Sequence, residues 1–177
     1  MDETAAPAGQ VALVTGASSG LPPERRLAIW RALLAAEGPR GEFAAGWVRG
    51  MALRNGAAWS QEIVTDWSAW TAEAQAAFLL TLPVERATWE LARSASRDAQ
   101  RRYWDRVHPW GAHDGSAAIF ARELLSHGRP WAAIEALSGL LHGAGRSDAE
   151  PPSELIESAR RDALRSEGRN AFRLDRL

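Results

Sequence analysis

The sequence contains no cysteine and no lysine, and each absence excludes a set of chemistries. Without cysteine, the chain has no disulfide, no thiolate nucleophile and no cysteine-based zinc site. Without lysine, Schiff bases, Walker A phosphate loops and lysine general bases are excluded. All 21 basic residues are therefore arginine, and this composition, with its abundant alanine, is typical of a GC-rich bacterial genome.

Neither sign of charge dominates, since the net charge is −1. A general nucleic-acid binder needs a large positive excess, so we expect no nucleic-acid partner. The basic and aromatic run Arg101–Trp104 falls inside an amphipathic helical pattern, where its arginines are expected to face solvent. The longest apolar run, near Ala76–Leu82, is far shorter than the ~20 residues that span a bilayer. Met1–Thr4 lacks the positive start of a signal peptide, so we expect a cytoplasmic protein with no membrane partner.

Hydrophobic residues recur at helical spacing along most of the sequence, and this periodicity predicts an all-α fold. We expect helices over about 22–37, 40–54, 57–67, 71–82, 85–93, 97–107, 116–126, 130–141 and 151–168. Thr71 and Ser96 are the expected N-caps of two of these helices. Val11–Val14 is the only β-like run, and four residues cannot form a sheet alone, so we expect no strand pairing there. The pattern predicts that these helices pack either as a short α-solenoid or as an irregular helical bundle.

The nine tryptophans stand out beside a single tyrosine. A tryptophan buries a large area and anchors helix packing. Most of the tryptophans on apolar helix stripes are expected to be buried between helices. The predicted structural anchors are Trp30, Trp47, Trp89, Tyr103, Trp104, Trp110 and Trp131.

The length of 177 residues fits one helical-repeat domain over 1–177. The small and polar stretch 143–152 is expected to be an internal linker, and 169–177 a tail. Repeats of about 40–47 residues are typical of helical arrays, so a domain of this length could hold a few such repeats. We expect either a whole domain or a fragment of a longer array. A weak internal repeat pairs Glu24 with Glu73, Ile29 with Phe78, Trp30 with Leu79, and Leu33 with Leu82; chance agreement between amphipathic helices is the alternative.

The glycine-rich stretch Val11–Gly20 closely resembles the first strand and turn of short-chain dehydrogenases, which bind a dinucleotide there. The likeness ends after about ten residues. Pro22 stands where that family has a further glycine. The family also has a catalytic lysine four residues after its catalytic tyrosine. In this sequence the residue four positions after the lone Tyr103 is Val107. We therefore interpret the stretch as a helix end followed by a loop, and we expect no NAD(P) cofactor.

A second candidate site is a histidine and aspartate cluster at His108, His113, Asp105 and Asp114. Imidazole and carboxylate ligands in a turn can bind zinc or iron. Their spacing matches no defined ligand motif, and the Pro-Trp-Gly sequence after His108 is typical of a sharp corner. We expect a structural corner without metal, in which Asp114, or alternatively Ser116, caps the next helix.

Several motifs lie in the second half of the sequence, at Leu80–Pro83, Thr88–Trp89, Tyr103–Gly111, Glu123–Pro130 and Pro151–Ile156. With these motifs, the stretch Ala72–Ser158 resembles an uncharacterised family of bacterial α-helical repeats, which occurs as long α-solenoid segments in large proteins. The resemblance covers about half the chain, and its Tyr-Trp…Pro-Trp-Gly corner is the most specific part. It implies antiparallel helix pairs that bury their apolar stripes against neighbouring pairs, and it implies no particular activity.

Two functions from different classes follow from these patterns. The first is a non-enzymatic helical-repeat scaffold or protein-interaction module, with a protein partner and with no catalytic residue, cofactor or metal. The alternative is a small enzyme, either a degenerate NAD(P)-binding protein around Gly16–Gly20 or a metal-dependent hydrolase around His108 and His113. A rise in melting temperature with NAD, NADP or divalent metals would favour the enzyme, because a ligand stabilises the state that binds it.

Overall fold

The computed structural model describes residues 23–110, 112, 116–142 and 152–174. Within these ranges the chain is all-α, as predicted, with no strand. No helix in the same ranges is long and apolar enough to cross a membrane. The elements are α2 (Pro23–Leu34), α3 (Pro39–Ile63), the 3-10 turn η1 (Trp67–Ala69), α4 (Ala72–Thr81), α5 (Arg86–Ser94), α6 (Arg97–Arg106), α7 (Ala117–Ser126), α8 (Pro130–His142) and α9 (Ser153–Leu174).

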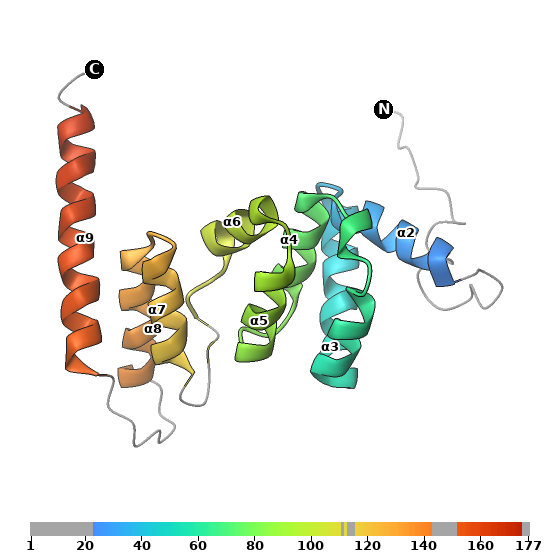
Figure 1. Ribbon diagram of the computed structural model, residues 1–177, viewed down its shortest axis with the longest axis horizontal. Helices are drawn as coiled ribbons and strands as arrows, with labels where there is room; N and C mark the ends of the chain where they lie inside the picture. The colour runs from blue at the N-terminus through green and yellow to red at the C-terminus, as the bar shows by residue number, and fades with distance from the viewer. Residues whose placement is uncertain (1–22, 111, 113–115, 143–151, 175–177) are drawn as a thin grey trace, which may run out of the picture.

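The helices form an elongated row from α2 at one end to α9 at the other (Figure 1). Each helix contacts helices close to it in sequence: α2 contacts α3, α3 and α6 each contact α4, α7 contacts α8, and α8 contacts α9. The architecture is therefore an all-α bundle in which the helices stack along one direction. Such local packing is expected where each amphipathic helix buries its stripe against the next one.

Local sequence signals set several helix ends. The hydroxyl oxygens of Thr71 and Ser96 accept hydrogen bonds from the backbone N–H groups of Ala74 and Ala99, at 3.2 and 3.3 Å. Both N-caps are ones that the sequence predicts. After α7, Gly128 adopts a φ of 72°, which a residue with a Cβ rarely adopts, and the chain turns into α8.

The helix α3 bends back on itself at Gly56, where the backbone has a φ of 73° and a ψ of −171°. The ring centroids of Trp47 and Trp59 lie 6.3 Å apart. In a straight helix, twelve residues would separate them by about 18 Å. The predicted break at Asn55–Gly56 is therefore confirmed, and α3 is a helical hairpin.

Aromatic rings join the first three helices. Trp30 of α2 stacks on Trp47 of α3, with centroids 3.9 Å apart and planes 11° apart. On the other arm of α3, Trp59 lies 6.3 Å from Phe78 of α4, which also meets Trp70 edge to face at 5.5 Å. Trp30, Trp47 and Trp59 are half-buried, whereas Phe78 is fully buried. Phe78 therefore ties α4 to this aromatic cluster.

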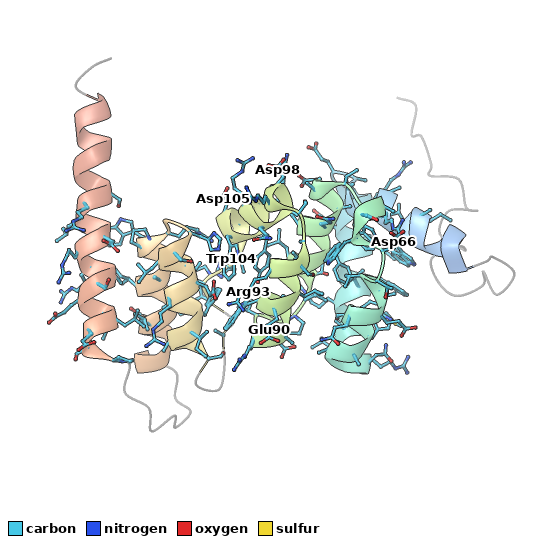
Figure 2. The ribbon with its side chains drawn as sticks, viewed as in Figure 1. Asp66, Glu90, Arg93, Asp98, Trp104 and Asp105 are labelled. Atoms are coloured by element: carbon cyan, nitrogen blue, oxygen red, sulfur yellow. The ribbon has the colours of Figure 1, made fainter. Side chains whose placement is uncertain are left out.

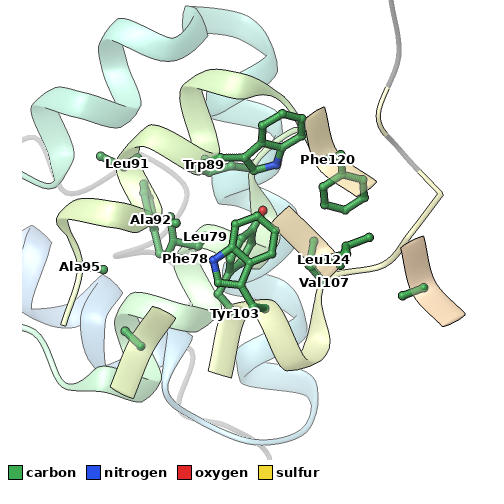
Figure 3. Close-up of a cluster of buried hydrophobic side chains, with 14 of the residues drawn as sticks. Phe78, Leu79, Trp89, Leu91, Ala92, Ala95, Tyr103, Val107, Phe120 and Leu124 are labelled. Carbon is green, nitrogen blue, oxygen red and sulfur yellow. The ribbon is translucent and has the colours of Figure 1, made fainter. Parts of the chain in front are cut away.

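A second aromatic cluster joins α5, α6 and α7 (Figure 3). Trp89 stacks on Phe120 with centroids 5.3 Å apart and planes 5° apart. Trp104 lies 6.2 Å from the same Phe120 and 5.0 Å from Tyr103. All four side chains are buried. This cluster therefore holds together the two halves of the row, which are α2 to α6 and α7 to α9.

Polar contacts also cross the boundary between α6 and α7. The Arg129 guanidinium, just before α8, donates hydrogen bonds to the carbonyl oxygens of Trp104 and Val107, at 2.7 and 2.8 Å. These carbonyl groups lie at the C-terminal end of α6, where no further N–H group of the helix is available to donate a hydrogen bond to them. Arg93 of α5, labelled in Figure 2, forms an ion pair with Glu123 of α7. The boundary between α6 and α7 is therefore fixed by specific bonds as well as by apolar packing.

Two of the predicted aromatic anchors are not buried. Trp131 is 49% exposed, because it lies about 200° around α8 from the buried Ala133, at about 100° per residue. Trp110 is 61% exposed, and the residue that packs at this corner is Pro109. The Trp110 backbone N–H donates to His108 Nδ1 at 3.2 Å, which closes the turn. Trp131 is therefore an exception to the expected burial of most tryptophans on helix stripes, and Trp110 is a predicted anchor that lies on the surface.

The last helix also differs from its prediction. α9 continues through Gly168 to Leu174, so most of the predicted tail over 169–177 is helical. A glycine inside a helix costs only about 1 kcal/mol relative to alanine, so it need not end one. Several other predictions lie outside the described residues, namely those on Val11–Val14, Gly16–Gly20, His113 and Asp114 and on most of the linker 143–152.

We predict that Trp89→Ala destabilises the protein far more than Trp131→Ala. Trp89 is 1% exposed and stacks on Phe120, and removing a buried large aromatic side chain costs about 3–5 kcal/mol. Trp131→Ala is expected to cost about 1 kcal/mol or less, because surface changes have small effects. Urea unfolding of both variants and the parent measures the difference. Equal losses would contradict the assignment of Trp89 to the core and Trp131 to the surface.

Candidate functional site

A cleft of about 620 Å³ lies over α4, between α3 and α6. Its volume is in the range typical of ligand-binding clefts. α4 contacts both α3 and α6, so it forms the floor while the other two helices form the walls. The end of α2 and the corner that joins it to α3 close one side. The main lining residues are Leu34, Ala36, Glu37, Gly41, Glu42, Ala45, Arg49, Glu73, Ala77, Leu80, Arg102 and Arg106.

Two glycines build the corner between α2 and α3. Gly38 precedes α3 with a φ of 71°, in the left-handed region that glycine adopts without strain. Gly41 lies in the first turn of α3, where an added Cβ would collide with the carbonyl oxygen of Ala36. The close approach of Gly41 to the end of α2 therefore sets the position of this cleft edge.

Glu73 is the central charged group of the floor. One carboxylate oxygen accepts from Arg102 Nη1 at 2.6 Å, and the other accepts from Arg106 Nη1 at 2.8 Å. Arg102 and Arg106 are four residues apart, so they lie on the same face of α6. A single carboxylate on α4 thus holds two guanidinium groups side by side on the α6 wall.

The α3 wall carries the remaining charges of the cleft. Glu37 and Glu42 lie near its start, and Arg49 lies two helical turns after Glu42, about 10 Å along the axis. Among the residues that the structure describes, none of these three makes an ion pair within 4.0 Å. Their charged groups are therefore available to a molecule in the cleft.

The side chains that line the cleft are of types suited to binding a ligand. Carboxylates, guanidinium groups and small apolar side chains supply charge, hydrogen bonds and a close approach. The Thr81 hydroxyl is buried and donates to the Phe78 carbonyl oxygen at 2.6 Å, so it is engaged within α4. No group of three metal-ligating side chains occurs among the described residues. A smaller hollow of about 210 Å³ near Gly56 is below the size typical of ligand sites.

The seven predicted aromatic anchors lie outside this cleft. The structure brings Trp30 and Trp47 together in the first aromatic cluster. It places Trp89, Tyr103 and Trp104 together in the second cluster. Trp110 and Trp131 are exposed, as described above. The candidate site is therefore made of residues other than these anchors.

Sequence reasoning did not find the charged residues of the cleft. The sequence predicts that the arginines of α6 face solvent, and Arg101 and Arg102 are both exposed. Arg101 pairs with Asp98 on its own helix, whereas Arg102 also reaches Glu73, 29 residues earlier. The only local signal was the spacing of four between Arg102 and Arg106, which places two charges on one face.

Two buried polar groups, the Tyr103 hydroxyl and the Trp89 N–H, lie in the second aromatic cluster. Burial raises the pKa of Tyr103, and the neighbouring Trp89 N–H opposes this rise only in part. Neither the Tyr103 hydroxyl nor the Trp89 N–H makes a full hydrogen bond to a described residue. The Tyr103 ring lies in the buried cluster (Figure 3) and packs 5.0 Å from the ring of Trp104, so Tyr103 acts as an apolar packing residue.

His127 lies at the end of α7 and stacks on Trp104, with centroids 4.7 Å apart and planes 11° apart. Desolvation by this packing lowers the pKa of His127, and the nearby carboxylates of Glu123 and Asp105 oppose the shift. The neutral imidazole is therefore the form that fits the boundary between α6 and α7.

Comparisons of the chain with protein-family models, with curated proteins and with solved structures find no match. The resemblance of Ala72–Ser158 to a helical-repeat family therefore stays a prediction. The cleft and its charges are the basis for the functional argument.

We predict opposite effects for the same substitution at two glycines of α3. Gly41→Ala should destabilise the protein by about 1–3 kcal/mol, because the new methyl group would push the Ala36 carbonyl away. Gly46→Ala should stabilise it by up to about 1 kcal/mol, because this helical glycine has open space around it and alanine favours the helix. Thermal or urea unfolding measures both. A stabilising Gly41→Ala would contradict the close approach of α2 and α3.

We also predict that His127 contributes to acid sensitivity. Because its folded-state pKa is lowered, protonation favours the unfolded state. The stabilising effect is present above the usual histidine pKa of about 6.5 and is lost as the pH falls below it. His127→Phe keeps a ring on Trp104 without titrating, so its unfolding midpoint should fall less than that of the parent over this range. An identical fall in both proteins would contradict the prediction.

Proposed function

We propose that this protein is a non-enzymatic helical-repeat module that binds another protein and serves as a scaffold. The observation that supports this proposal is the cleft over α4, whose floor carries Ala77 and Leu80 beside the paired Glu73 and whose walls are charged. The lining supplies recognition groups rather than an arrangement of nucleophile, base and oxyanion donors. The partner is expected to place a polypeptide segment in the cleft.

The form of the cleft favours a polypeptide over a compact small molecule. Its floor follows the axis of α4, where Glu73, Ala77 and Leu80 are spaced by four and three residues along one helix face. Two helices flank this floor, and helical arrays bury such surfaces by adding a further element beside them. A segment laid along α4 would continue the packing that the rest of the array uses.

The remaining parts of the proposal come from the sequence. Balanced charge supports a protein partner over nucleic acid, and we propose a cytoplasmic location. The alternative of a small enzyme depends on Gly16–Gly20 and His113, which lie outside the described residues. No observation on the described residues favours that alternative.

Site-specific photo-crosslinking tests the proposed function. A photoreactive amino acid is introduced at Ala45, which lines the cleft, and in a matched variant at Ala58, which is exposed on the other arm of α3. In cells that express the full chain, irradiation should yield a discrete polypeptide adduct at Ala45 and none at Ala58.

Two outcomes would overturn the proposal. The first is the absence of an adduct at Ala45, or equal adducts at both positions. The second is a catalytic turnover that a single substitution abolishes while the fold is retained. Circular dichroism of each variant establishes that the helical structure is intact.

A further inference from the structure

The α6 wall of the cleft is basic, whereas the start of the α3 wall is acidic. Glu37 and Glu42 lie at the start of α3 and its entry corner, and Arg102 and Arg106 belong to α6. α4 separates these walls, since it contacts both helices. A segment that lies along α4 would therefore meet acidic side chains on one flank and basic side chains on the other.

We propose that the cleft binds an amphipathic helix of a partner protein whose two flanks carry opposite charges. The basic flank of that helix lies against Glu37 and Glu42, and its acidic flank lies against Arg102 and Arg106. This inference rests on the proposed function, and it specifies the chemistry of the partner.

Glu73 positions Arg102 and Arg106 on the α6 wall and leaves most of their N–H donors free for a ligand. Each of Arg102 and Arg106 gives one Nη1 hydrogen bond to Glu73, whereas a guanidinium group has five N–H donors. Their side chains remain 46% and 53% exposed. The free donors can bind carboxylates of the partner in the paired geometry that arginine favours.

The floor sets the apolar face of the bound helix. Ala77 and Leu80 present a small and then a larger apolar group, three residues apart on α4. Ala45 on the α3 wall is equally small, so a helix backbone can approach closely. A helix in this position needs small or medium apolar residues toward α4, as in other helix-in-groove complexes.

Arg49 adds a second feature to the charge pattern. It follows Glu42 on the α3 wall by two turns, about 10 Å, and reverses the sign of the charge. The flank of the partner that faces α3 should therefore be basic opposite Glu42 and acidic opposite Arg49. This change of sign fixes the register of the bound helix.

A purely acidic ligand fits the cleft poorly. The lining contains three arginines and three glutamates, so its formal charges balance. An acidic ligand that reached Arg102 and Arg106 would bring its remaining charges toward Glu37 and Glu42. Like charges placed together disfavour the wrong partner, so the acidic wall supplies selectivity.

The test uses three labelled synthetic helical peptides and the full chain. All three share one Ala/Leu face. The first carries one basic and one acidic flank, with the sign change expected opposite Arg49; the second has two acidic flanks, and the third two basic flanks. Fluorescence anisotropy at low salt should show that the mixed peptide binds at least about tenfold more tightly than either uniform peptide, and that added salt reduces the difference.

A substitution on the acidic wall should change this preference. Glu42→Arg makes the α3 wall basic, so the peptide with two acidic flanks should become the tightest binder. Glu62→Arg is the matched control, because Glu62 is exposed on α3 outside the cleft. It should leave the parent order of the three peptides unchanged, with circular dichroism showing that both variants are folded.

The possible failures are distinguishable. Equal binding of the three peptides, or no binding by any of them, overturns the charge-polarised helix as the occupant. If the Ala45 adduct is still formed, the proposed protein-binding function stands without this inference. If two acidic flanks bind best to the parent protein, the cleft is an acidic-peptide site and the role assigned to Glu37 and Glu42 is wrong.

Discussion

The stacking of Trp89 on Phe120 is the interaction on which the continuity of the row of helices depends. It joins α5 to α7 across the boundary between the two halves, and Trp104 completes the same cluster from α6. The exposed ion pair of Arg93 with Glu123 adds little by comparison, because surface ion pairs contribute about 0–1 kcal/mol. Burial of large aromatic surfaces therefore fixes the two halves, and the hydrogen bonds of Arg129 orient them.

This rigid frame explains how α4 can serve both the core and the cleft. Its inner face buries Ala74 and Phe78 against the neighbouring helices. Its outer face carries Glu73, Ala77 and Leu80 into the cleft. Because the two faces belong to one short helix, the core contacts of Phe78 also hold the floor in place. A site built on a packed helix is held more firmly than one built on a loop.

The sequence predicted those features whose causes are local. The caps at Thr71 and Ser96 and the break at Gly56 follow from a few neighbouring residues, and the structure has all three. The burial of Trp131 depended on which face of α8 meets other helices, and periodicity alone placed it wrongly. The pairing of Glu73 with Arg102 could not be predicted, because their separation in sequence carries no periodic signal.

The absence of lysine has a consequence at the cleft. A lysine ammonium is a strongly hydrated point charge, whereas the arginine fork is planar, retains its charge and is more weakly hydrated. Two arginines can therefore share the Glu73 carboxylate at 2.6 and 2.8 Å and still present donors to a second carboxylate. The same composition that excludes lysine chemistry thus provides a basic wall suited to recognition. In this wall, Glu73 orders the guanidinium groups before any partner arrives, which reduces the entropy lost on binding.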